Sequence, residues 1–568
     1  MALTETTEAS EAAESQPAAS AERPVSPPVG SWPPATDHKV IGSVCVLVAV
    51  LFLGATGVLG VMMRSQLVTP RGSVVSTTVY RQLFTLHGLL GVFGFLAPVW
   101  VGLATALVPL QIGSARLAFP RLQALVVGLF VAGGALLVAS PFVKGAKPIT
   151  GWALSTPIPE GRAFRGHGPD LVILGVAVVA VALVLASANL LVTVLKLRAP
   201  GLTLRRTPLF SWSVAVSASV LILALPVLLG GLTMLFVDRH YGGHVFSGFT
   251  GSGGGNPNLW PRIFWFAAYP MLWALLLPGL GVICEIVPVF ARRRLFSRPR
   301  AVAALAAVGV LAFAGWGSEV PGLHRARGVF AVGALLVLAP VASLVLNWLT
   351  TVVTALLPPR TTRPALRSAP MLYAGGAVTV LALGLAGGVV AAVGATTTAH
   401  RNHWQVATQH TLFFGVAILA VAAALSYWAP KLWGRHLSEK AAVPGAGLLT
   451  LGLLLTFVPA YVLGAQDMRV HLATYSGHDE LWAANVVSTL GAFVLALGLL
   501  VLAADLVVNV VGRRGRRPGD DPWQGHTLEW ATSSPPPSHN FDRLPEIRSE
   551  APLLDLRPEA TPVDQEQD

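Results

Sequence analysis

The sequence has little charge for its length. Of its 568 residues, 12% are charged and 54% are hydrophobic. A water-soluble domain of ordinary composition carries about twice this fraction of charged residues. Apolar runs of about 20 residues, which suffice to cross roughly 30 Å of hydrocarbon as a helix, recur from Val40 to Val511. The composition therefore excludes a soluble domain and predicts a protein of the lipid bilayer.

Cysteines, and acidic residues within the apolar runs, are also scarce. The two cysteines, Cys45 and Cys284, lie inside apolar runs and are expected to be small packing residues rather than metal ligands or a disulfide. No Asp or Glu lies near the middle of a run, since Glu285 and Asp505 lie toward the ends of theirs. A proton route through hydrocarbon normally needs carboxylates or histidines in series. The sequence shows no such series.

The apolar runs predict an all-α membrane protein of about twelve transmembrane helices, within residues 37–512. The glycines that interrupt these runs suit close helix packing in lipid. The expected spans are 40–63, 82–108, 121–143, 170–195, 211–237, 262–290, 301–317, 328–357, 371–394, 405–432, 444–465 and 483–511.

The ends of the chain and the charge pattern predict the topology. Residues 1–36 are rich in Ala, Ser, Pro and Glu and are expected to be disordered, whereas 513–568 form a polar C-terminal tail. The net charge of +12 comes from basic residues grouped in alternate loops, a positive-inside pattern rather than a nucleic-acid surface. Both termini are therefore expected in the cytoplasm. The groups are Arg116 and Arg121; Lys196, Arg198, Arg205 and Arg206; Arg292, Arg293, Arg294, Arg298 and Arg300; Arg360, Arg363 and Arg367; Lys431, Arg435 and Lys440; and Arg513, Arg514, Arg516 and Arg517.

Two of the fourteen histidines, His87 and His410, lie inside apolar segments. An ionisable side chain at membrane depth costs free energy and is usually kept for a function. Both lie about one and a half turns from the outer end of their spans. At matching depth on two helices, they could ligate one haem iron from both faces. They could equally form hydrogen bonds across helices with no cofactor between them.

Several motifs, in order along the chain, resemble subunit I of the bacterial haem–copper respiratory oxidases. The likeness covers roughly residues 37–550. The motifs are YRQLFTLHG at 80–88, VPLQIG at 108–113, AFPR at 118–121, RAPG at 198–201, PLFSW at 208–212, STLGAF at 488–493, TLEWATSSPPP at 527–537 and HNF at 539–541.

This resemblance implies that one haem site is retained. In the family, a histidine of the second helix and one of the tenth hold a low-spin haem, and these positions are His87 and His410 here. Arg64 matches an arginine at the periphery of that haem. Arg469 matches the second of two arginines that pair with haem propionates, but the first is Met468.

The resemblance also implies that the oxygen-reducing site is lost. The second histidine of the tenth helix, which ligates the other haem, is Thr408. The sixth-helix motif His-Pro-Glu-Val-Tyr is YPMLW at 269–273, so that Tyr269, Met271 and Trp273 replace a copper ligand, a proton-relay glutamate and a tyrosine. The His-His pair of the seventh helix is Ser318-Glu319. No copper is therefore expected.

The residues of the family's proton routes are replaced as well. The loop aspartate that opens one route is Arg116, the asparagine further along it is Gln123, and the eighth-helix lysine of the other route is Leu344. The His-Asp pair of the family's outer metal site is His400-Arg401, in which the acidic member has become basic.

The sequence thus predicts a haem-binding membrane relative of cytochrome c oxidase subunit I, in the plasma membrane of a bacterium, with one low-spin haem and no catalytic site. Its expected partners are lipid, other subunits of a respiratory complex and an electron donor. The alternatives are an active terminal oxidase, a haem-free scaffold or assembly partner, and a transporter, which would need a polar midplane site that the sequence does not show.

Overall fold

The computed structural model describes residues 36–144, 151–154, 166–246, 254–320, 323, 326–358, 363–394, 402–475 and 479–557. Residues 1–35 of the expected disordered segment lie outside these ranges. Within them the chain is all-helical, as expected, apart from turns and one isolated bridge between Asn402 and Arg469. The α-helices are α1 (His38–Gln66), α2 (Thr77–Leu89), α3 (Ala97–Gln111), α4 (Pro120–Ala139), α5 (Gly168–Lys196), α6 (Leu209–His240), α7 (Leu259–Phe290), α8 (Arg298–Leu311), α9 (Arg327–Leu356), α10 (Ala369–Gly394), α11 (His403–Gln409), α12 (Val416–Trp433), α13 (Glu439–Ala465), α14 (Asp479–Leu506) and α15 (Pro552–Asp555).

Short segments of other helix types complete the spans. Among the described residues, three are π-helices, η1 (Leu90–Leu96), η6 (His410–Gly415) and η7 (Val507–Val511). The first joins α2 to α3, the second joins α11 to α12, and the third extends α14. Each of the three combinations forms one continuous span. The remaining segments are 3₁₀-helices, η3 (Leu204–Arg206), η4 (Trp316–Glu319) and η8 (Leu528–Ala531).

Eleven helices of the described part of the chain are long and apolar enough to cross a membrane. The other expected span, 301–317, is formed by α8, which has 14 residues and would reach only about 21 Å. The backbone then continues through a turn and η4. Ser297, before α8, bonds Asn347 near the end of α9, whereas a Cβ on Gly333, near the start of α9, would meet Ala314. The crossing is therefore completed by irregular backbone, which is tolerated at membrane depth when other helices cover it.

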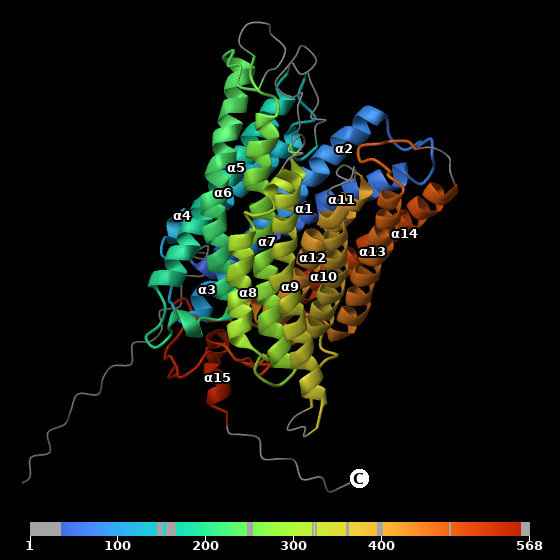
Figure 1. The fold of residues 1–568 in the computed structure, drawn as a ribbon. Helices are drawn as coiled ribbons and strands as arrows, with labels where there is room; N and C mark the ends of the chain where they lie inside the picture. Colours follow the sequence, from blue (N-terminus) through green and yellow to red (C-terminus); the bar gives the residue numbers. More distant parts are fainter. Residues whose placement is uncertain are drawn as a thin grey trace, which may run out of the picture.

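Three spans form the interior of the bundle. The most apolar windows of the α2–α3 span, of α7 and of the α11–α12 span are almost entirely buried, whereas those of α1 and α14 are mostly exposed. Figure 1 shows α4, α5 and α6 on one side and α13 and α14 on the other, with α7 and α12 between them. The exposed outer faces are apolar, as expected for helices that contact lipid.

The C-terminal segment packs against one end of the bundle instead of trailing away as a tail. The Glu529 side chain accepts hydrogen bonds from Gln111 of α3 and Trp428 of α12, both at 3.2 Å. Asn540 contacts His38 at the start of α1, and its amide donates to the Ser114 carbonyl. In Figure 1 this segment lies below α3. Residues 513–557 therefore cover the end of the bundle at which the chain enters α1.

Candidate functional site

A cavity of about 230 Å³ lies between α1, α2, η1, η6, α13 and α14. Its lining is mainly apolar, with aromatic side chains from several helices. The few polar side chains that reach it are Thr56, Arg64, His87, Gln409, His410 and Thr456. A mainly apolar cavity with a few convergent polar groups is the usual form of a cofactor site.

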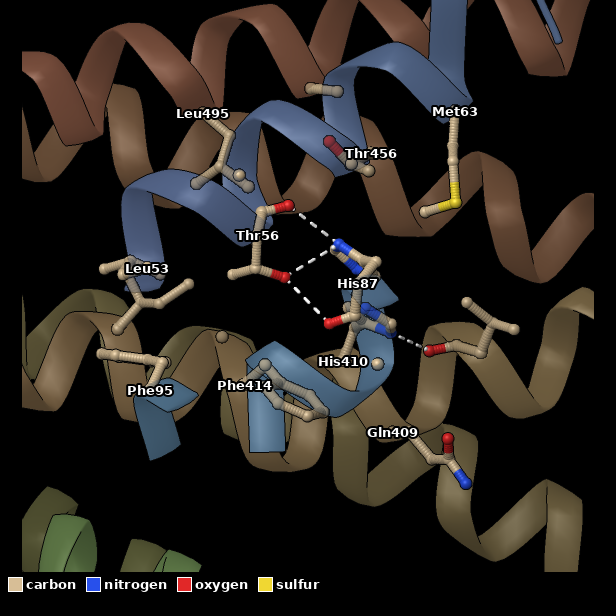
Figure 2. A pocket seen from close by; sticks show the side chains of 18 of the residues that line it. Leu53, Thr56, Met63, His87, Phe95, Gln409, His410, Phe414, Thr456 and Leu495 are labelled. Atoms are coloured by element: carbon tan, nitrogen blue, oxygen red, sulfur yellow. Dashed lines mark hydrogen bonds between the residues drawn. The ribbon is translucent and has the colours of Figure 1, made fainter. Parts of the chain in front are cut away.

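His87 and His410 approach each other across this cavity, as the sequence predicts. Their ring centres lie 5.9 Å apart and their planes differ by 11°. Figure 2 shows the two rings side by side, with Thr56 beside His87.

The Nδ1 atom of each ring bonds the backbone of the chain. His87 Nδ1 lies 2.9 Å from the Thr56 carbonyl oxygen and 3.1 Å from the Thr56 hydroxyl. His410 Nδ1 lies 2.8 Å from the Val406 carbonyl oxygen. A carbonyl can only accept, so each Nδ1 carries the proton and each Nε2 keeps its lone pair. Neither Nε2 takes part in a hydrogen bond among the described residues.

Both histidines stand next to a π-helix. Asn402 caps α11 by accepting from the Trp404 amide at 3.0 Å, and η6 begins at His410, two turns later. On the other side, Ser76 caps α2 and η1 begins three residues after His87. Single π-turns inside α-helices occur frequently at functional sites. Here they change the helical register beside each imidazole.

Two glycines of α1, Gly57 and Gly60, line the cavity and leave space in it because they have no side chain. A Cβ on Gly60 would lie 3.1 Å from the His87 ring, and one on Gly57 would meet only Leu499, at 3.9 Å. A side chain at either position would therefore take up part of this space. On the opposite wall, the His410 ring lies against Phe457, with ring centres 4.7 Å apart.

The two arginines expected near the haem, Arg64 and Arg469, differ in position. Arg64 lines the cavity and donates to Asn485 through one guanidinium nitrogen, while none of the described residues accepts from its buried Nε. It also lines a smaller adjoining cavity with Tyr80 and His403. Arg469 is exposed and lines neither cavity. Met468 is buried, and its carbonyl accepts from His403.

The region around Tyr269 and Trp273 is closely packed. The Trp273 ring meets Phe413 of η6 at 5.1 Å between centres, and Tyr269 at 6.4 Å. A Cβ on Gly315 would lie 2.6 Å from the Tyr269 hydroxyl, which leaves no free space beside it. Aromatic side chains thus fill part of this space, as expected from the larger residues at these positions.

The other replaced positions around this region bear no imidazole. Glu319 Oε2 accepts a hydrogen bond from Gln405, and the Ser318 hydroxyl donates to the Gly315 carbonyl. Met271 and Leu344 are fully buried apolar residues. The Thr408 side chain interacts with the Tyr461 hydroxyl. In the described part of the chain, no three His, Cys, Asp or Glu side chains are grouped as a metal site.

Of the positions on the family's proton routes, Gln123 is fully buried and bonds Thr105 and Asn189, whereas Arg116 is exposed. His400 and Arg401 lie outside the described residues.

Sequence reasoning missed the groups that orient the two histidines. Thr56 is a lone hydroxyl in an apolar run, a signal that could have been followed, but the Val406 contribution is a backbone carbonyl and has no sequence signal. His403, which precedes the expected span 405–432, begins α11 and is buried, with Nδ1 3.0 Å from the Met468 carbonyl oxygen.

Comparison with known proteins identifies the family of this chain. The family described as Cytochrome C and Quinol oxidase polypeptide I matches residues 40–494. The chain belongs to this family. A putative cytochrome c oxidase subunit 1-beta of Streptomyces coelicolor is 35% identical over 94% of this chain and 92% of its own length. A quinol oxidase subunit 1 of Bacillus subtilis is 32% identical over 93% of this chain and 81% of its own length.

Membership agrees with the helical bundle. The protein is a multi-pass membrane protein of the haem–copper oxidase family, and its bacterial relatives indicate the plasma membrane. The names of these relatives do not indicate a degenerate active site.

Proposed function

We propose that this chain binds one six-coordinate, low-spin haem between His87 and His410, transfers electrons within a respiratory complex and does not reduce oxygen. The observation that carries the proposal is the imidazole pair. Each Nδ1 bonds a backbone carbonyl, and the ring centres are 5.9 Å apart across an apolar cavity.

The residues present fit a haem. Metal–imidazole bonds of about 2 Å on both faces of an iron require ring centres roughly 6 Å apart. The second requirement, a free Nε2 on a ring held by its Nδ1, matches the way ligating histidines are usually supported. Members of this family bind haem. A haem with two imidazole ligands supplies one-electron transfer and leaves no open coordination position.

The other residues have roles that do not depend on catalysis. Thr56 and the Val406 carbonyl fix the ring orientations, which raises the basicity of each Nε2. The apolar lining excludes water, and the buried Arg64 brings a cation to the edge of the cavity, where it would offset the negative charge of a carboxylate.

The absence of oxygen reduction is proposed on three grounds. Thr408 offers no imidazole to a second haem, and a hydroxyl is a poor ligand beside imidazole. Tyr269, Ser318 and Glu319 stand where the family's copper ligands are, in a region that aromatic side chains fill. Leu344 and Arg116 stand where the proton routes need a lysine and an aspartate.

Optical spectra of the purified protein, oxidised and dithionite-reduced, together with its haem content, test the haem site. We expect one haem per chain with the sharp reduced bands of a low-spin centre. His87→Ala and His410→Ala should lose this spectrum, whereas the matched variant His240→Gln, at an ion pair with Asp170, should keep it. Protein that is folded but free of haem would instead favour a scaffold role.

An active terminal oxidase is the second candidate, because the relatives are named as oxidases. An oxygen electrode with haem-replete protein and reduced donors separates the two. We expect no uptake above that of a mock preparation. Steady, cyanide-sensitive uptake that depends on His410 would establish the oxidase instead.

A further inference from the structure

A second, open hollow of about 820 Å³ lies at the end of the bundle where α1 begins. It is formed by the start of α1, the loop before α4 and residues 538–539 of the C-terminal segment. It is far along the α1 and α3 spans from the haem cavity and shares no lining residue with it. Nothing in the proposed haem function uses it.

Two exposed arginines, Arg116 and Arg121, give this hollow its charge. No carboxylate of the described residues forms an ion pair with either one. The acids nearby are already engaged, because Asp37 pairs with Lys39 at 3.1 Å and Asp542 pairs with His539. His38 is also engaged, since its two ring nitrogens bond the Thr105 carbonyl and Asn540. The charge left facing the hollow is positive.

An exposed apolar stripe runs along α4, away from the hollow. Its residues are Leu125, Gly128, Ala132 and Ala135. They follow Arg121 at spacings of four, three, four and three residues, which places all five on one helix face. Leu125 is 54% exposed, and nothing would lie within 4 Å of a Cβ on Gly128. Phe119, at the rim of the hollow, is 50% exposed. A cationic hollow thus continues directly into a surface that contacts lipid tails.

We propose that this hollow binds the phosphate headgroup of an anionic phospholipid, with Arg116 and Arg121 on the phosphate and the acyl chains on the α4 stripe. Arginine matches phosphate oxygens through its planar fork of donors. A free phosphate would satisfy the arginines but would leave the stripe without a role. The continuity of charge and apolar surface therefore favours a lipid.

The arginine at position 116 also distinguishes this chain from its relatives. Arg116 stands at the position of the aspartate through which relatives are expected to take up protons. Arginines at this position would hold the phosphate, whereas a guanidinium cannot take up and release a proton as a carboxylate does, so the same substitution that removes one role would create the other.

The experiment uses the full chain in nanodiscs of phosphatidylcholine that contain a small fraction of spin-labelled phosphatidylglycerol. We expect an immobilised phosphatidylglycerol population that the equally labelled phosphatidylcholine does not show. Arg116→Glu with Arg121→Glu should weaken this selectivity by at least about thirtyfold, the loss expected from removing two arginines near a headgroup alone. The control, Arg293→Glu with Arg300→Glu, changes the same charge on two exposed residues outside the hollow and should retain the selectivity.

Inorganic phosphate and glycerol 3-phosphate, each in millimolar excess, distinguish the two sources of phosphate. Neither should displace the lipid, because neither occupies the stripe. Displacement by either, equal loss in both double variants, or unchanged selectivity in the Arg116 and Arg121 variant would overturn the proposal. The haem spectrum should be the same in all of these variants.

Discussion

The span formed by α11, η6 and α12 separates two regions that are built in opposite ways. On the His410 side, apolar walls and glycines leave a cavity, and hydrogen bonds hold the rings at its centre. On the Trp273 side, aromatic rings and a Glu319–Gln405 hydrogen bond occupy the space. Protein interiors tend to pack closely, so a cavity that is to hold a cofactor must be kept open by particular residues, such as the glycines and the hydrogen-bonded histidines here. A region that holds no cofactor, such as the one around Trp273, can instead be filled by side chains.

The largest effect should come from exchanging the residues that distinguish the two sides. His410→Thr should abolish haem binding, because one of the two imidazoles is lost. Thr408→His should add no second haem, since Trp273 and Phe413 occupy the region. Haem content per chain measures both. A second haem in Thr408→His would show that the filled side is still a site.

The next effect concerns stability on the filled side. Trp273→Ala should lower the free energy of unfolding by about 3–5 kcal/mol, because it leaves a cavity in a packed region. Unfolding in a denaturing detergent titration, without haem, is the measurement. Trp482→Ala, at a position that is 47% exposed, should cost much less. An equal loss in both variants would contradict the close packing.

The sequence predicted the histidine pair because an imidazole in an apolar run is conspicuous, and it predicted the spans because apolar length is a local property. It did not predict the early end of α8 or the π-turns at His410 and after His87. Nor did it predict Thr56 as the partner of His87, 31 residues away. These features depend on contacts between distant segments. The packing of 513–557 against the bundle was missed for the same reason, since a polar, proline-rich composition resembles a tail.

A smaller effect is expected from narrowing the open side. Gly60→Ala places a methyl group about 3.1 Å from the His87 ring and should weaken haem retention roughly tenfold, within the 1–3 kcal/mol range of overpacking. Gly54→Ala, where no atom would lie within 4 Å of the new Cβ, is the matched control. Haem transfer to apomyoglobin gives the relative retention. Equal haem retention in the two variants would contradict the expectation that bound haem lies close to Gly60 of α1.

The smallest effect should follow from loosening one histidine. Thr56→Val removes the hydroxyl but keeps the carbonyl that accepts from His87 Nδ1. Haem should remain bound with at most about a tenfold loss of affinity, and its reduction potential should rise, because the imidazole becomes a weaker donor. The control is Thr456→Val, whose hydroxyl also lines the cavity but donates to Gly452. A redox titration that finds the same potential in both variants would exclude this role for Thr56.

The most direct test of the account is the carbon monoxide difference spectrum of the reduced, haem-replete protein. Carbon monoxide binds only a ferrous haem with an open coordination position, and a bis-histidine haem has none. We predict one haem per chain and no spectral change on adding the gas. A second haem, or a photolabile carbon monoxide adduct that persists in folded, freshly prepared protein, would contradict the claim that this chain transfers electrons without activating oxygen.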